Sequence, residues 1–159
     1  MLQILFVQSC GIPDETLICF NQAIEFDPTN PIYYLKKVKF LESLQRFKEV
    51  IECFNQVIQL DPTNPYFHYN KAYCLYGIEK YEEAILCCDQ AIQLDPNNSL
   101  YYNLKAYSLE RLNRHKDAIE CFDKSIQIDG YSFMYTKLNH FNNLESTKKP
   151  LNASRKLLN

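Results

Sequence analysis

Apolar residues recur along the chain at spacings of three and four, the period of one face of an α-helix. In residues 65–98 this pattern occurs twice, over 67–78 and again over 81–92. Asn64-Pro65 opens the first stretch, with a good N-cap before a residue favoured at the first helical position. Asp95-Pro96 closes the second, because proline disfavours helical geometry in the residue before it. The pattern predicts two helices of about 14 residues joined by a short turn, and therefore antiparallel.

This helix pair repeats every 34 residues. Asp-Pro occurs at 27–28, 61–62 and 95–96, Asp-Gly follows at 129–130, and the neighbouring sequence repeats too, as in FNQAIEFDPTNP and FNQVIQLDPTNP. A period kept over three steps indicates a repeat architecture. We number each unit so that its proline is position 32. The predicted divisions are an N-terminally truncated repeat (1–30), three complete repeats (31–64, 65–98 and 99–132), a first-helix segment (133–145) and a remainder (146–159).

Small side chains occupy three fixed positions of the unit, where they let helix axes approach closely. These are Val38, Ala72 and Ala106 at position 8; Thr16, Val50, Ala84 and Ala118 at position 20; and Ala23, Val57, Ala91 and Ser125 at position 27. Repeat 31–64 has valine at all three, so its helices are expected to lie slightly further apart.

Aromatic residues recur near positions 4, 17 and 24, as Tyr34, Tyr102, Phe47, Tyr81, Phe20, Phe54 and Phe122. Together with the small positions and the proline, they make residues 1–145 resemble the tetratricopeptide repeat. The departures are His68 and His115 in two aromatic positions, Cys88 in a third and Gly130 in place of the last proline. A pentatricopeptide interpretation, which would imply RNA, is disfavoured by the period and by the acidic charge of the repeats.

The resemblance implies an all-α fold, a right-handed α-solenoid of about four stacked helix–turn–helix repeats plus a C-terminal capping helix at 133–145. Stacking is required because one helix pair cannot bury both of its faces. Residues 146–159 are predicted to be a disordered basic tail. The chain opens inside a unit with apolar residues near its start, which suggests the end of a longer array or a shortened product. If it stands alone, this exposed N-terminal repeat end is expected to drive self-association.

Charge is unevenly distributed over the chain. Residues 1–130 carry 12 Lys/Arg against 18 Asp/Glu, whereas residues 131–159 carry five basic residues against one acidic residue. The acidic repeats argue against a dedicated nucleic-acid binder. No apolar run approaches the roughly 18 residues of a transmembrane helix, and no signal peptide is recognisable. We therefore predict a cytoplasmic protein that does not enter membranes.

The seven cysteines and three histidines are candidates for metal-ligating or catalytic residues. Cys19, Cys53, Cys87 and Cys121 share position 23, and a residue repeated with the unit is most simply a packing residue. There is no CxxC, no H-E-x-x-H and no phosphate-binding glycine motif. We predict no metal, no cofactor and no enzymatic activity.

Lysine also recurs, at position 7, as Lys37, Lys71 and Lys105. A ladder of anion-binding ammonium groups is one interpretation. The favoured one is that each stem packs along the helix pair and leaves its ammonium in water.

In repeats of this family the first helices line a concave groove, through positions 2, 5, 6, 9, 12 and 13. Tyrosine is frequent there, and tyrosine is enriched in binding hot spots. Asn70 and Asn103 are candidates for hydrogen bonds to a peptide backbone, and Lys36 and Lys39 for contacts with an acidic side chain. The alternative is that some of the tyrosines pack between neighbouring repeats. The predicted partner-binding residues are Lys36, Lys39, Tyr66, Tyr69, Asn70, Tyr73, Tyr76, Leu100, Asn103 and Tyr107.

Chaperone-binding members of the family hold a C-terminal carboxylate with five groove residues. Only Asn70 matches here, because Leu35, Lys39, Leu100 and Leu104 occupy the other four positions. A chaperone carboxylate clamp is therefore not expected.

The predicted function is a non-catalytic protein–protein interaction scaffold that binds a peptide segment of a partner in the concave groove. One alternative is a recognition fragment of a larger repeat-containing enzyme or complex, for example of the glycosyltransferase type. RNA binding through the tyrosines and the basic tail is a less favoured alternative.

Overall fold

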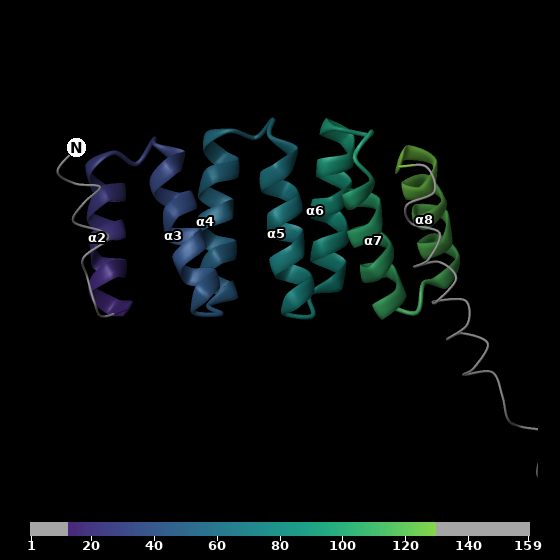
Figure 1. Ribbon diagram of the computed structural model, residues 1–159, viewed down its shortest axis with the longest axis horizontal. Coiled ribbons are helices and arrows are strands. Elements are labelled where there is room, and N and C mark those ends of the chain that lie inside the picture. The colour runs from purple at the N-terminus through teal and green to yellow at the C-terminus, as the bar shows by residue number, and fades with distance from the viewer. Residues whose placement is uncertain (1–12, 130–159) are drawn as a thin grey trace, which may run out of the picture.

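The computed structural model describes residues 13–129, which fold entirely into α-helices and short turns (Figure 1). The helices are α2 (Pro13–Phe26), α3 (Pro31–Ser43), α4 (Phe47–Leu60), α5 (Pro65–Gly77), α6 (Tyr81–Leu94), α7 (Ser99–Arg111) and α8 (His115–Asp129). The predicted capping helix at 133–145, the predicted tail at 146–159 and the predicted apolar N-terminal end lie outside the described residues.

The helices follow one another along the long axis of the molecule, and each packs against the helices next to it in sequence (Figure 1). The two helices predicted for residues 65–98 are α5 and α6. In addition, α5 packs against α7, the first helix of the following repeat. The predicted all-α solenoid of stacked helix–turn–helix units is thus confirmed. None of the helices between residues 13 and 129 is long and apolar enough to cross a lipid bilayer.

Each first helix begins with the same cap. The side-chain oxygens of Asn30, Asn64 and Asn98 accept hydrogen bonds of 3.1 Å from the backbone N–H groups two residues further on. Such a bond satisfies one of the N–H groups that a helix N-terminus leaves unpaired. Because α3, α5 and α7 start identically, equivalent positions of the unit point in equivalent directions in each repeat.

The turn inside each repeat also has one geometry. Gln45, Glu79 and Asn113 adopt left-handed backbone conformations, with φ of 57°, 64° and 60°. In the second of these turns, Lys80 N–H donates to the carbonyl of Leu75 and Glu79 N–H to that of Tyr76. This is the Schellman arrangement, in which a left-handed residue usually supplied by glycine ends the helix. The sequence did not predict it, because none of the three residues is glycine.

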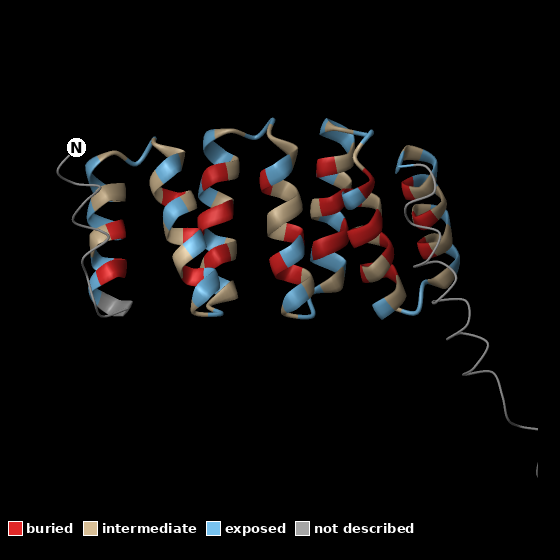
Figure 2. Ribbon diagram, in the orientation of Figure 1, coloured by how far each residue is buried: buried red, intermediate tan, exposed pale blue. Residues whose placement is uncertain are grey.

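The core lies between the helices (Figure 2). The small residues at position 20 of the three complete repeats, Val50, Ala84 and Ala118, are fully buried. Leu41, Leu75 and Leu109 at position 11 are equally inaccessible and are the largest of the fully buried side chains. Small residues where helices cross and leucine in the remaining space give the close packing of a protein interior.

The cysteines behave as packing residues. Cys53, Cys74 and Cys88 are buried and form no disulfide. Burial raises the pKa of the Cys53 thiol more than the nearby Lys37 lowers it, and burial raises the pKa of Cys74 to about 12. These thiols therefore stay protonated and poorly nucleophilic. Among residues 13–129, no group of His, Cys, Asp or Glu is arranged to hold a metal ion.

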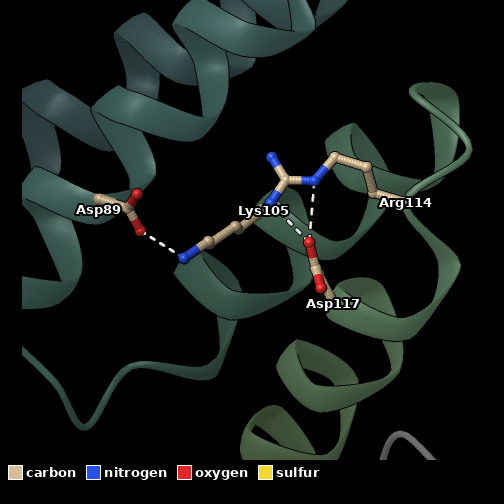
Figure 3. A network of polar contacts seen from close by, with 4 residues as sticks. All are labelled: Asp89, Lys105, Arg114 and Asp117. Carbon is tan, nitrogen blue, oxygen red and sulfur yellow. Dashed lines mark hydrogen bonds and ion pairs between the residues drawn. The ribbon is translucent and has the colours of Figure 1, made fainter.

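Two of the three position-7 lysines, Lys37 and Lys105, link one repeat to another. Lys105 Nζ lies 2.6 Å from Asp89 Oδ1 on α6 (Figure 3), and Lys37 Nζ donates to Asn21 Oδ1 on α2 at 2.7 Å. Partial burial alone would lower the pKa of Lys105, but the hydrogen bond and charge of Asp89 outweigh burial and raise it. The favoured prediction, an ammonium left in water, is therefore wrong for Lys105. Arg114, by contrast, pairs with Asp117 within one turn of the start of α8 (Figure 3).

Candidate functional site on the first helices

The candidate site consists of side chains of α3, α5 and α7 that remain at least partly accessible to solvent, although Tyr76 and Tyr107 also pack against the core. We call it the first-helix face. Its members are Ile32, Lys36, Lys39, Glu42, Tyr66, Asn70, Tyr73, Tyr76, Leu100, Tyr107, Glu110 and Arg111, all of them exposed or half-buried. The caps described above place these residues in register from one repeat to the next.

Four tyrosines of α5 lie on or beside this face and divide into two kinds. Tyr66 and Tyr73 are each 59% exposed. Tyr69 and Tyr76 are half-buried, and their rings contact Tyr101 and Tyr81 at centroid distances of 5.3 and 5.5 Å. Burial also raises the pKa of Tyr69, which keeps its hydroxyl neutral. The packing alternative therefore applies to Tyr69 and Tyr76, whereas Tyr66 and Tyr73 present their rings to solvent.

Tyr107 of α7 resembles the packed pair. It is half-buried, and its ring meets that of Phe122 edge to face at 5.3 Å. This geometry is favourable for aromatic rings, so Tyr107 contributes to the stability of its own repeat. Only part of its surface remains available to a ligand.

Two of the three lysines of α3, Lys36 and Lys39, have no polar partner among the described residues, whereas Lys37 is bonded to Asn21. Lys36 and Lys39 are exposed, and neither forms a hydrogen bond or ion pair with any residue between 13 and 129. They are one helical turn apart, so both ammonium groups lie on the same side of α3. The α3 end of the first-helix face is thus cationic, whereas its centre on α5 is aromatic and uncharged.

The two asparagines predicted to meet a peptide backbone lie in different environments. Asn70 is half-exposed, and its Nδ2 donates to the Tyr66 carbonyl at 2.7 Å. Asn103 is only 4% exposed, and neither of its amide atoms has a hydrogen-bond partner within the described chain. Leu104 is also buried. In this conformation Asn103 does not reach the surface, which corrects the exposure expected of it.

Glu110 and Arg111 form the other end of the face. Arg111 Nε donates to the Tyr81 hydroxyl at 3.0 Å, and the guanidinium carbon lies 5.3 Å from the centroid of that ring. Burial raises the pKa of Glu110 to about 7. Near neutral pH this carboxyl is partly protonated and can donate as well as accept hydrogen bonds. The sequence did not predict this raised pKa, because nothing in it distinguishes Glu110 from exposed Glu42 at the same position of the unit.

Tyr66 and Leu100 are two of the exposed large hydrophobic residues on α5 and α7, and Ile32 on α3 is a third. All three occupy position 2, the second residue of their helices. The predicted partner-binding residues include Tyr66 and Leu100. They do not include Ile32, although it occupies the same position of its repeat.

A separate cleft of about 520 Å³ lies between α2, α3 and α4. It is lined by Asn21, Ile24, Glu25, Tyr34, Lys37, Glu49, Glu52, Cys53 and Gln56. None of the predicted partner-binding residues lines it. Its glutamates make it acidic, although Glu49 is paired with Arg46 and Lys37 is bonded to Asn21. No pattern in the sequence predicted this cleft.

Comparison with known proteins agrees with the repeat geometry. Models of the tetratricopeptide repeat match residues 32–64, 65–98 and 87–120. These matches extend over residues 32–120, so the chain belongs to the tetratricopeptide repeat family. No curated protein matches the chain by sequence.

Solved structures with this fold include MamA 41-end from Desulfovibrio magneticus RS-1, with a TM-score of 0.74 and 20% identity over 92% of this chain and 84% of that one. "MamA MSR-1 C2" gives a TM-score of 0.67 and 23% identity, over 82% of this chain and 75% of that one. The second TPR of Spaghetti (RPAP3), solved bound to the HSP90 peptide SRMEEVD, gives 0.59 and 25% over 62% of this chain and 92% of that one.

Proposed function

We propose that the chain is a protein-interaction scaffold whose first-helix face is concave and binds a peptide segment of a partner protein. The observation that carries the proposal is the pair Tyr66 and Tyr73, whose rings are 59% exposed on the middle first helix although the core does not need them there. Tyrosine offers a large contact area and a hydroxyl at low entropic cost, which suits it to binding.

The neighbouring side chains support a peptide rather than a small molecule. The tyrosines of α5 lie between the unpaired lysines of α3 and the exposed Leu100 of α7, so one ligand would meet charge, aromatic rings and an aliphatic side chain in turn. Contact between α5 and α7 supports placing the first helices on the inner side of the curve. The peptide-bound RPAP3 repeat supports the general mode of binding. This support does not extend to a carboxylate clamp, because only one of its five residues, Asn70, is present in this chain.

The test is an affinity capture from cell lysate with mass spectrometry, comparing the wild type with Asn70→Ala/Tyr73→Ala. A matched control is Leu86→Ala/Gln90→Ala, which removes an exposed large apolar side chain and an exposed amide from α6. We expect a small set of partners to be lost with the face variant and kept with the control. Truncating one exposed hot-spot tyrosine typically costs about 2 kcal/mol of binding free energy, roughly 30-fold in affinity.

Helicity by circular dichroism is compared first, because loss of the Asn70 bond to the Tyr66 carbonyl could loosen α5. If a folded face variant retains the same partners as the wild type, the first-helix face is not the binding surface. If the control variant loses them instead, the second helices carry the interaction.

A further inference from the structure

Exposed apolar side chains are concentrated along one edge of the molecule. Nine large hydrophobic residues between 13 and 129 are exposed, and six of them flank the three turns that join one repeat to the next. At each turn, one is the last residue of the second helix and the other is the second residue of the following first helix. The pairs are Phe26 and Ile32 (74% and 56% exposed), Leu60 and Tyr66 (39% and 59%), and Leu94 and Leu100 (41% and 49%).

The three turns lie on the same side of the row of helices, at the top in Figure 1. We call the six side chains and the turns between them the turn edge. Single exposed apolar residues are normal on proteins, but a repeated row of them indicates an interaction surface. Half of this row belongs to the ends of second helices, which the first-helix face does not include.

Each apolar pair encloses one negative charge. Asp27, Asp61 and Asp95 follow the helix ends, and the Oδ1 of each accepts a hydrogen bond of 3.1–3.2 Å from the backbone N–H two residues on. Segments 26–32, 60–66 and 94–100 contain no lysine or arginine. Within the described residues none of these aspartates forms an ion pair. The turn edge therefore alternates exposed apolar groups with half-buried carboxylates. Asp27 and Asp61 also accept hydrogen bonds from the hydroxyls of Thr29 and Thr63, so their charges are hydrogen-bonded but not neutralised by a cation within the described residues.

We propose that the turn edge docks a cationic amphipathic helix of a partner protein. Its apolar stripe would cover the flanking pairs, and its lysines or arginines would meet the three aspartates. Packed helices lie roughly 8–10 Å apart, so three turns separated by two repeat steps extend over about 16–20 Å, the length of about 11–13 helical residues. An anionic lipid surface fits less well, because it carries the same sign of charge as the aspartates.

The experiment measures binding of a fluorescently labelled peptide of about 18 leucine and lysine residues, long enough as a helix to span the edge. A second peptide with the same apolar stripe and glutamate in place of lysine is the matched ligand control. With the full chain, we expect the lysine peptide to bind at least about tenfold more tightly than the glutamate peptide, with the difference shrinking as salt rises.

Two variants locate the site. Phe26→Ser/Ile32→Ser removes the most exposed apolar pair and is expected to weaken binding of the lysine peptide about tenfold. Asp27→Asn/Asp61→Asn/Asp95→Asn removes the charges while keeping the oxygen that accepts the turn hydrogen bond. It is expected to weaken binding about three- to tenfold without loss of helicity. This second variant keeps the proposal testable if the first folds poorly.

Controls separate this site from general attraction and from the first-helix face. Glu52→Gln/Glu82→Gln/Glu120→Gln makes the same change of charge at exposed positions of the second helices, and it should leave binding unchanged. The face variant Asn70→Ala/Tyr73→Ala should also leave it unchanged, so this proposal and the proposed function fail independently. An equal loss with the glutamate control, or no loss with either edge variant, would overturn the proposal. So would a wild type that sediments as a dimer when Phe26→Ser/Ile32→Ser is a monomer, because a second copy would then occupy the edge.

Discussion

In repeat 31–64 and in repeat 65–98, the first helix follows a capping asparagine, begins with proline and ends at a left-handed residue. Leucine fills position 11 in both and is inaccessible in both. Yet position 9 holds Lys39 in one and Tyr73 in the other, both exposed. The caps, turns and core set where a side chain points, and the face is free to differ because its residues contribute little to packing.

The interiors of the two repeats differ as well. Position 20 is Val50 in the first and Ala84 in the second, and both are fully buried. The same fold therefore accommodates two side-chain volumes at one helix crossing, provided that the surroundings are packed to match. Four groups of substitutions test how far equivalent positions of the repeats have equivalent environments.

The largest effect is expected at the shared leucine. Leu75→Ala and Leu41→Ala each delete most of a fully buried side chain, and each should lower the free energy of unfolding by about 2–5 kcal/mol. Urea unfolding followed by circular dichroism measures both. Similar losses would support equivalent cores, whereas a loss below about 1 kcal/mol in one repeat would show that its core collapses around the gap.

Exchanging the small residues at position 20 should show that the interiors of the two repeats are not interchangeable. Ala84→Val adds two methyl groups to an interior already closed around alanine and should cost about 1–3 kcal/mol of stability. The reverse change, Val50→Ala, should also destabilise, because it opens a void in a repeat packed around valine. Thermal unfolding of the two variants measures this. If Ala84→Val is tolerated without loss, the two interiors have interchangeable packing.

A pH-dependent difference is expected at position 12. Because burial raises the pKa of Glu110 from 4.5 to about 7, the folded chain keeps a proton that the unfolded chain has released in this range. Stability therefore falls as pH rises through the window. Glu110→Gln should be more stable than the wild type by about 1–2 kcal/mol above pH 7, after allowance for partial solvent screening, and about equal to it near pH 4.5.

Exposed Glu42, at the same position of repeat 31–64, supplies the control. Glu42→Gln removes the same charge from an exposed position of the unit and is measured alongside Glu110→Gln. A gain of the same size for both variants would assign the effect to net charge rather than to burial of Glu110.

The smallest effect concerns the turn inside each repeat. Left-handed backbone costs most residues about 1–2 kcal/mol, so Glu79→Gly and Gln45→Gly should each stabilise by about 1 kcal/mol. Asn113→Gly should gain less, because asparagine tolerates this conformation. The midpoints of urea unfolding measure the stability of the three glycine variants. Glu79→Ala is the control, for which no gain in stability is expected. An equal gain in stability for Glu79→Ala and Glu79→Gly would show that the gain does not come from the left-handed backbone conformation.

The sequence by itself determined the repeat and its helices. The period of 34, the asparagine caps and the Asp-Pro breaks act within a few residues of chain, so the ends of α5 and α6 follow from local rules. The positions of the small residues could also be predicted, because every repeat must place small side chains where its helices cross. Family membership follows from the same residues.

Only the tertiary structure decided which surface residues are open. It places Asn103 inside, pairs Lys105 with Asp89, half-buries Glu110 and leaves Phe26 exposed. These outcomes depend on how the helices pack around each residue, and for Lys105 the partner lies on a helix of the preceding repeat. For that reason equivalent positions of one unit, such as those of Glu42 and Glu110, have different environments although the sequence assigns them the same place.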